Sequence, residues 1–122
     1  MTSVCMHETA IAGNIIDIVT ETGRRHPDVE IKRVRVVIGE MIAVVPELLL
    51  HAYDSLITDT PLQYSSLDLT IIPVTANCSQ CDASFGIDEF EFTCPFCQSS
   101  SIQLTSGHEF YVKEVEVEPC PS

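Results

Sequence analysis

Residues 78–97 read CSQCDASFGIDEFEFTCPFC, with one Cys-x-x-Cys pair at Cys78 and Cys81 and a second at Cys94 and Cys97. In each pair, two intervening residues allow a tight turn to aim both sulfurs at one point. The twelve residues between the pairs suffice for a short hairpin that brings the two turns together. Four thiolates in a tetrahedron suit zinc, and a closed site without an open position is structural, not catalytic. We therefore expect a metal to hold this segment together, because it is too small to bury an adequate core.

Other uses of these four cysteines remain open from the sequence. They are two disulfides, a dithiol redox site or a rubredoxin-like iron centre. Iron is the most serious rival, because four thiolates accept it in the same geometry. The chain has six cysteines, and four of them fall into the two pairs, which favours a metal in a reducing cytosol over a disulfide framework.

The charge of the chain argues against nucleic-acid binding. Zinc ribbons often bind nucleic acid, but residues 75–106 contain no Lys or Arg and carry the acidic residues Asp82, Asp88, Glu89 and Glu91. The whole chain has 18 acidic and 6 basic residues, a formal charge of −12. Such a field repels the phosphate backbone and instead favours cations and basic partner surfaces.

Working outward from the cysteines, the flanking sequence predicts two amphipathic helices. The first covers residues 9–23, and Gly23 stands where a helix C-terminus prefers glycine. The second begins near Pro46, which suits a first helical position. The side chains expected on the buried faces are Ile11, Ile15, Ile18, Val19 and Thr22 in the first helix and Leu49, Tyr53, Leu56 and Ile57 in the second.

Alternating apolar residues predict three strands in the same flanking sequence, at 31–38, 67–71 and 109–117, the first of them ended by Gly39. Together these elements indicate an α+β fold. Residues 1–74 plus 107–122 form a main domain of two helices on a small mixed sheet. Residues 75–106 are inserted into it as a zinc-ribbon domain of short β-hairpins.

The composition and the absence of certain motifs indicate where the protein acts and which classes of function are not expected. Hydrophobic residues make up 45% of the 122 residues, which supports a folded core. No run of roughly 18 apolar residues exists, so no membrane span is expected. The first residues lack the basic and apolar regions of a secretory signal, so we expect a cytoplasmic protein. The five glycines form no phosphate-binding loop and no catalytic constellation has informative spacing, so an enzyme is not expected.

Several short motifs occur in one order along the chain. Met6-His7-Glu8 is followed by a helix, a strand ending in Ile38-Gly39-Glu40, the two cysteine pairs and a closing strand that starts with Gly107-His108-Glu109. In this order and spacing the chain resembles the HypA/HybF family of hydrogenase nickel-incorporation proteins, over nearly its whole length from Met6 to Glu118.

The resemblance implies a nickel metallochaperone. Nickel would be held at the N-terminus by the His7 imidazole and nearby backbone nitrogens, with Glu8 beside it, while Cys78, Cys81, Cys94 and Cys97 hold structural zinc. Nitrogen donors in a square plane suit Ni(II), so the two metals can be sorted by ligand type and geometry. The resemblance implies a HypB-type GTPase as partner, a [NiFe] hydrogenase large-subunit precursor as recipient, and a homodimer as a possible assembly.

The start of the chain departs from the family pattern. In the family Met-His-Glu is the true start and the free amine joins the nickel ligands, whereas five residues precede Met6 here. We favour translation from Met6; if Met1 is the start, Cys5 offers a thiolate beside His7. Glu40 is expected to support the turn near the nickel site. His26, His51, His108 and Cys120 are interpreted as residues without a ligand role.

Two other functions remain open from the sequence. A rubredoxin-like electron carrier would explain the cysteines and the acidity but gives residues 1–74 no purpose. A zinc-ribbon interaction module without a nickel role is the other.

Overall fold

The computed structural model describes residues 3–87 and 91–120, and the chain divides into two compact units. The first unit contains the residues up to Val36, Val44–Thr70 and the residues from Tyr111 onward. The second contains Val37–Ala43 and Ile71–Phe110. The cysteine-bearing unit is therefore larger than the predicted insert 75–106, because segments before and after the insert belong to it.

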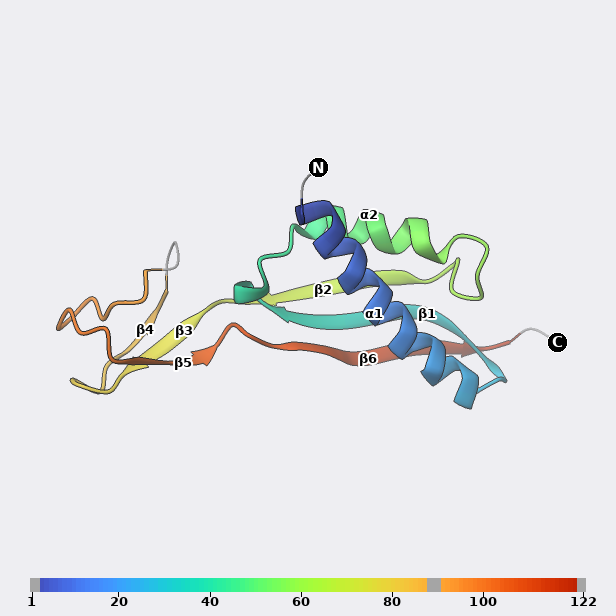
Figure 1. Ribbon diagram of the computed structural model, residues 1–122. Coiled ribbons are helices and arrows are strands. Elements are labelled where there is room, and N and C mark those ends of the chain that lie inside the picture. The colour runs from blue at the N-terminus through green and yellow to red at the C-terminus, as the bar shows by residue number, and fades with distance from the viewer. Residues whose placement is uncertain (1–2, 88–90, 121–122) are drawn as a thin grey trace. The chain divides into compact units, whose positions relative to one another are not determined.

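The first unit is built from two helices and a three-stranded sheet (Figure 1). The helices are α1, Ser3–Arg25, and α2, Pro46–Ile57. The sheet has the order β2-β1-β6, with β1 at Val29–Gly39, β2 at Ser66–Ile72 and β6 at Phe110–Pro119. The predicted α+β class is confirmed, and all five predicted elements form close to their predicted positions.

The core of the first unit lies between the helices and one face of the sheet. Ile11, Ile15 and Val19 are buried on α1 at helical spacing, and Val34 and Val36 are buried on the same face of β1. On α2, Leu49, Tyr53 and Ile57 are buried, and each buried side chain of this size contributes roughly 1.5–3 kcal/mol. The Tyr53 hydroxyl shares a hydrogen bond with Ser65 Oγ at 2.7 Å, and burial raises the pKa of Tyr53.

Two side chains predicted to be buried are exposed instead. Ile18 on α1 is 47% exposed and Leu56 on α2 is 42% exposed. Each lies one position before a buried residue of the same helix, Val19 and Ile57 respectively, about 100° away around the helix axis. The α1 helix also continues past Gly23 to Arg25. Gly23 allows close packing there, since a Cβ on it would lie 3.2 Å from Ile31 Cδ1.

The second unit contains a small antiparallel sheet of order β4-β3-β5. Its strands are β3 at Thr75–Cys78, β4 at Ser84–Gly86 and β5 at Ile102–Ser106. The buried cluster consists of Val74, Ala76 and Ile87, with four partly buried hydrophobic residues packed around it: Met41, Phe85, Ile102 and Leu104. A core of this size is not enough to stabilise the unit on its own.

Two glycines of the second unit allow its backbone segments to approach closely. The N–H of Gly39 donates to the carbonyl of Glu109 at 2.6 Å, and the N–H of Met41 donates to the carbonyl of Gly107 at 2.8 Å. A Cβ at Gly39 would overlap the Gly107 carbonyl. Gly107 itself has a φ of +106°, a backbone conformation that favours glycine.

Side-chain hydrogen bonds at the same place fix the flanking residues. Glu40 begins a short 3-10 helix, Glu40–Ile42, and its Oε1 accepts the N–H of Val74 at 3.1 Å. Glu109 Oε1 accepts the N–H of Gly107 at 2.8 Å. Glu40 thus has a structural role in the second unit. The helices in the described part of the chain include none that is long and apolar enough to span a bilayer.

Candidate metal centre

The two Cys-x-x-Cys pairs form two turns with the same local hydrogen bonds. In the first turn, the Cys78 carbonyl accepts the N–H of Asp82 at 2.9 Å and the N–H of Gln80 points at Cys78 Sγ, 3.4 Å away. The second turn repeats this pattern. The Cys94 carbonyl accepts the N–H of Gln98 at 2.9 Å, and the N–H of Phe96 points at Cys94 Sγ from 3.4 Å. Each turn therefore supplies a thiolate that is already stabilised by a backbone donor.

The residue after each pair adopts a left-handed conformation that closes the turn. Asp82 has a φ of +62° and Gln98 a φ of +67°. This conformation is common for glycine and costs other residues roughly 1 kcal/mol. Neither residue is a ligand, and no sequence signal pointed to their role, because the usual signal at such a position is a glycine.

The four sulfurs converge on one point. Their ligand atoms lie within 4.8 Å of one another, with 3.5 Å between the sulfurs of Cys78 and Cys97 and 3.6 Å between those of Cys81 and Cys94. A tetrahedral zinc site with Zn–S bonds of about 2.3 Å has sulfur–sulfur edges of about 3.8 Å. Disulfide sulfurs lie about 2.05 Å apart, so the observed separations fit a shared metal and not two disulfides. All four cysteines are free thiols.

The four thiols differ in burial. Cys78 and Cys94, the first cysteine of each pair, are buried, whereas Cys81 and Cys97 are exposed. A metal at this centre would have one buried and one solvent-facing ligand from each turn. All four coordination positions would be filled by protein sulfur, which leaves no open position for a substrate.

The first thiolate forms most readily at Cys78. Hydrogen bonds from the backbone of Cys81, then of Gln80, lower the pKa of Cys78 to about 7 in spite of its burial. The backbone of Ser99 acts in the same direction on Cys97, but the interaction with the Cys78 sulfur, loss of solvation around the sulfur, and the Cys94 and Cys81 sulfurs outweigh it and raise the pKa of Cys97 to about 12. A bound cation would compensate the thiolates that form when the cluster takes up a metal.

At the N-terminal end, the structure places the Glu8 side chain inside the fold. Glu8 is 1% exposed, and its Oε2 accepts the N–H of Val45 at 2.6 Å, at the N-cap of α2. Its Oε1 is buried and has no hydrogen-bond partner among the described residues. The backbone of His7 lies in α1, and its side chain lies outside the described part of the structure. The Glu8 carboxylate is therefore committed to linking α1 with α2.

The other candidate residues in the described part of the chain do not belong to the cysteine cluster. His51 and His108 are exposed, and His26 lines a small apolar cavity at the end of α1. The N–H of Cys120 donates to the carbonyl of Asp28 at 2.9 Å, which places Cys120 beside the turn before β1. Within residues 8–87 and 91–120, the four cysteines form the only group of three or more potential metal ligands close enough to share an ion.

Comparisons with known proteins cover nearly the whole chain. The model of the family described as hydrogenase/urease nickel incorporation, metallochaperone, hypA matches residues 6–117. The hydrogenase maturation factor HypA of Desulfatibacillum aliphaticivorans is 33% identical over 113 residues, which cover 92% of this chain and 87% of that protein. Hydrogenase maturation factor HypA 2 of Bradyrhizobium diazoefficiens is 34% identical over 113 residues, covering 93% of this chain and all of that protein (100%).

Two solved structures share the fold. The solution structure of the Ni metallochaperone HypA from Helicobacter pylori superposes with a TM-score of 0.62 at 23% identity, covering 89% of this chain and 95% of the other. A second solution structure, of a HypA protein, gives a TM-score of 0.67 at 24% identity over 93% of this chain and 97% of the other. At this level of identity the two structures bear on the fold alone.

Proposed function

The chain belongs to the HypA family of hydrogenase/urease nickel-incorporation metallochaperones, and from this premise we propose that it binds Ni(II) at Met6-His7-Glu8 and delivers it to a [NiFe] hydrogenase large-subunit precursor. The observation that carries the proposal is the family match over residues 6–117, whose first residues are this tripeptide. Zinc bound by Cys78, Cys81, Cys94 and Cys97 has a structural role in it.

The zinc assignment rests on the chemistry of the cysteine centre. Four thiolates at near-tetrahedral separations suit Zn²⁺, which has no redox activity and stabilises small modules by roughly 10–16 kcal/mol of apparent folding free energy. The second unit has only a small buried cluster, so it depends on such a contribution. We assign zinc to the ribbon, residues 75–106, and nickel binding to residues 1–74 plus 107–122.

The nickel ligands proposed are the His7 imidazole and backbone nitrogens at the start of α1. Nitrogen donors in a square plane suit Ni(II). Glu8 contributes its backbone nitrogen, because its side chain is buried and bonded to Val45. The Glu8 side chain also holds α1 against the start of α2. This contact would fix the position of the backbone next to the proposed nickel ligands.

The residues before Met6 compete with nickel for the same backbone nitrogens. α1 begins at Ser3, and in an α-helix each amide from the second turn onward donates to the carbonyl four residues earlier. The amides of His7 and Glu8 are therefore satisfied by Ser3 and Val4. If α1 began at Met6, these amides would be in the first turn, where no helical acceptor exists. A chain that starts at Met6 would thus present both nitrogens and a free amine.

The proposed role is that of a metal carrier that catalyses no reaction, and it implies particular partners and a compartment. The chain has no phosphate-binding loop, so a separate GTPase of the HypB type would supply nucleotide hydrolysis. The net charge of −12 favours encounters with basic partner surfaces. We expect such a carrier to act in the cytoplasm, where a homodimer is one possible assembly.

Calorimetry with nickel on zinc-loaded protein tests the proposal. The chain from Met1, the chain from Met6 and the His7→Ala variant of each are compared, with His51→Ala as a matched control at an exposed histidine. We expect about one nickel per chain with tighter binding for the Met6 chain, loss of binding in both His7→Ala variants, and no effect of His51→Ala. Absence of nickel binding in both parent chains, with zinc at one per chain, would contradict the proposal and favour a zinc-stabilised interaction module.

A further inference from the structure

The sheet of the first unit ends at β6, and α1 has an exposed apolar side chain, Ile18. β6 is the last strand in the order β2-β1-β6, and within the described residues no strand pairs with its outer edge. In Figure 1 the last turns of α1 lie past β6. Two large apolar side chains are exposed here: Ile18 on α1 is 47% exposed and Val117 on β6 is 45% exposed.

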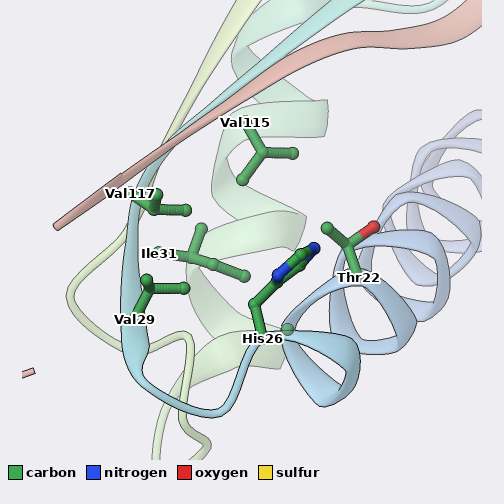
Figure 2. Close-up of a pocket in the computed structure, with 7 residues that line it drawn as sticks. Thr22, His26, Val29, Ile31, Val115 and Val117 are labelled. Carbon is green, nitrogen blue, oxygen red and sulfur yellow. The ribbon is translucent and has the colours of Figure 1, made fainter. Parts of the chain in front are cut away.

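A small cavity lies under the end of α1, next to the same edge. Its volume is about 240 Å³, and its lining is almost entirely apolar, with Val115 and Val117 from β6 and Ile31 from β1. Figure 2 shows the His26 ring and Thr22 on the opposite wall. Ile18 and Thr22, one helical turn apart, also border a second shallow hollow on α1, which the charged residues Asp17, Glu21 and Arg25 line as well. Thr22 therefore borders both hollows, and Ile18 lies one helical turn from the cavity that Val115 and Val117 of β6 line.

The other face of β6 is acidic. Glu114 and Glu116 both contact Arg35 on β1, and Glu118 follows two residues later on the same face of the strand. On this face Arg35 contacts two carboxylates of β6, those of Glu114 and Glu116, and Glu118 adds a third. The edge of the sheet presents half-exposed valines on its inner side and glutamates on its outer side.

We propose that the outer edge of β6 receives a β-strand from a partner protein in which apolar residues alternate with Lys or Arg. Its backbone would pair with the free N–H and C=O groups of β6, as extended peptides do when they add to a sheet edge. Its apolar side chains would cover Val117 and Ile18 and reach the cavity, while its basic side chains would lie beside Glu116 and Glu118.

Charge and size argue against the other occupants. A second copy of this chain pairing β6 with β6 in the antiparallel direction would set glutamates opposite glutamates, which is destabilising. The cavity, at about 240 Å³, is smaller than the roughly 300–1,000 Å³ typical of small-molecule sites. The proposal rests on β6 and α1 alone and is independent of nickel binding.

The test measures binding of a fluorescent peptide of ten residues, the length of β6, in which Val and Lys alternate. The protein is the zinc-loaded full chain, and the readouts are fluorescence anisotropy and amide protection along β6. We expect Val117→Glu and Ile18→Glu each to weaken binding by about tenfold or more, since each would bury a charge. Leu56→Glu is the matched control, because Leu56 is 42% exposed on α2, and it should bind as the parent does.

Charge reversal separates specific pairing from general attraction. Glu118→Lys should weaken the Val/Lys peptide several-fold and strengthen a Val/Glu peptide of the same length. A peptide of the same composition with its lysines in one block should bind poorly, because it cannot alternate. Raising salt from about 0.1 M to about 1 M should weaken the Val/Lys peptide, as the screening length falls from about 10 Å to about 3 Å.

The outcomes that overturn the proposal are distinct. Equal binding of the blocked and alternating peptides would mean that only net charge matters. Parent-like binding by both Val117→Glu and Ile18→Glu, with unchanged circular dichroism, would place the peptide elsewhere. Protection of β6 that increases with protein concentration in the absence of peptide would identify a second copy as the occupant.

Discussion

Glu8 Oε2 accepts the backbone N–H of Val45 at 2.6 Å, so a buried carboxylate near the start of α1 holds the N-cap of α2. The second oxygen, Oε1, has no hydrogen-bond partner among the described residues. The N-cap residue is Val45, which has no side-chain acceptor of its own, and no side-chain cap bond is made there. Glu8 thus supplies from another helix the acceptor for the N-cap N–H that a Glu or Gln at the third helical position provides in a capping box.

Glu8→Ala is expected to destabilise the protein by about 1–3 kcal/mol, because the Val45 N–H loses its side-chain acceptor and a small cavity remains. Glu8→Gln keeps one oxygen for Val45 and should cost less than half as much. Urea unfolding measures both. Glu47→Ala, at an exposed acidic residue in the first turn of α2, is the control and should cost only about 0.3–1 kcal/mol. Equal losses in all three variants would remove the special role of Glu8.

The same variant separates a backbone role of Glu8 in nickel binding from a side-chain role. If only the backbone nitrogen of Glu8 joins the nickel, Glu8→Gln should bind nickel within about twofold of the parent, since the amide and the carboxylate occupy the same buried place. Calorimetry on the zinc-loaded Met6 chain provides the measurement. A loss comparable to that of His7→Ala would show that the carboxylate leaves its position beside Val45 to bind the metal.

Asp82 and Gln98 adopt a left-handed backbone conformation, which costs free energy for these residues but not for glycine. Both have a positive φ, +62° and +67°, directly after the second cysteine of each pair. Asp82→Gly and Gln98→Gly should each stabilise the zinc-loaded protein by about 0.5–1 kcal/mol, whereas Gln98→Val should destabilise it by a similar amount or more. Competition with a zinc chelator is the measurement. The idea fails if the glycine variants release zinc more readily than the parent.

Zinc uptake should release more protons at low pH than at high pH. The pKa of Cys78 is lowered to about 7, so this thiol is largely protonated at pH 6 and largely ionised at pH 8. Binding at pH 6 must displace the Cys78 proton, and binding at pH 8 need not, so the difference should be roughly one proton per zinc. Zinc affinity should fall accordingly as the pH is lowered. Calorimetry in buffers of different ionisation enthalpy counts the protons, and Cys78→Ser should abolish the difference.

The sequence predicted the elements well because their signals are local. The alternation of Val34, Val36 and Ile38 and the two Cys-x-x-Cys turns depend on near neighbours, and the structure agrees with both. The failures concern which positions of a helix the rest of the fold covers, and this depends on residues far away in the sequence. Ile18 and Leu56 both follow helical spacing, but they are exposed beside the buried Val19 and Ile57.

The site was predictable only in its ligands. Cysteine spacing predicts four thiolates, but it carries no information about which residues support them. Asp82 and Gln98 adopt a glycine-like conformation without being glycines. The burial of Glu8 depends on Val45, which is 37 residues away along the chain, and no periodic pattern links the two. A single acidic residue after a histidine looks like solvent-exposed surface until the fold places it inside.

Gly39 and Gly13 offer a matched pair for the last prediction. Gly39 has an ordinary extended conformation, φ −73° and ψ 148°, so an alanine is allowed there by the backbone itself. Its Cβ, however, would overlap the carbonyl of Gly107, where β1 ends against the chain segment that leads into β6. The clash is with main chain and cannot be relieved by rotating a side chain. Gly39→Ala should therefore cost roughly 3 kcal/mol or more and expose the amide of Met41, which bonds the same carbonyl.

Gly13→Ala is the matched control. Gly13 lies in α1, and outside the backbone of the helix no atom lies within 4 Å of the Cβ that an alanine would add. This substitution should instead stabilise the protein by up to about 1 kcal/mol through helix propensity. Urea unfolding of both variants, with hydrogen exchange at Met41, gives the answer. A Gly39→Ala variant as stable as the parent would mean that this close approach of the two backbones is not maintained in solution.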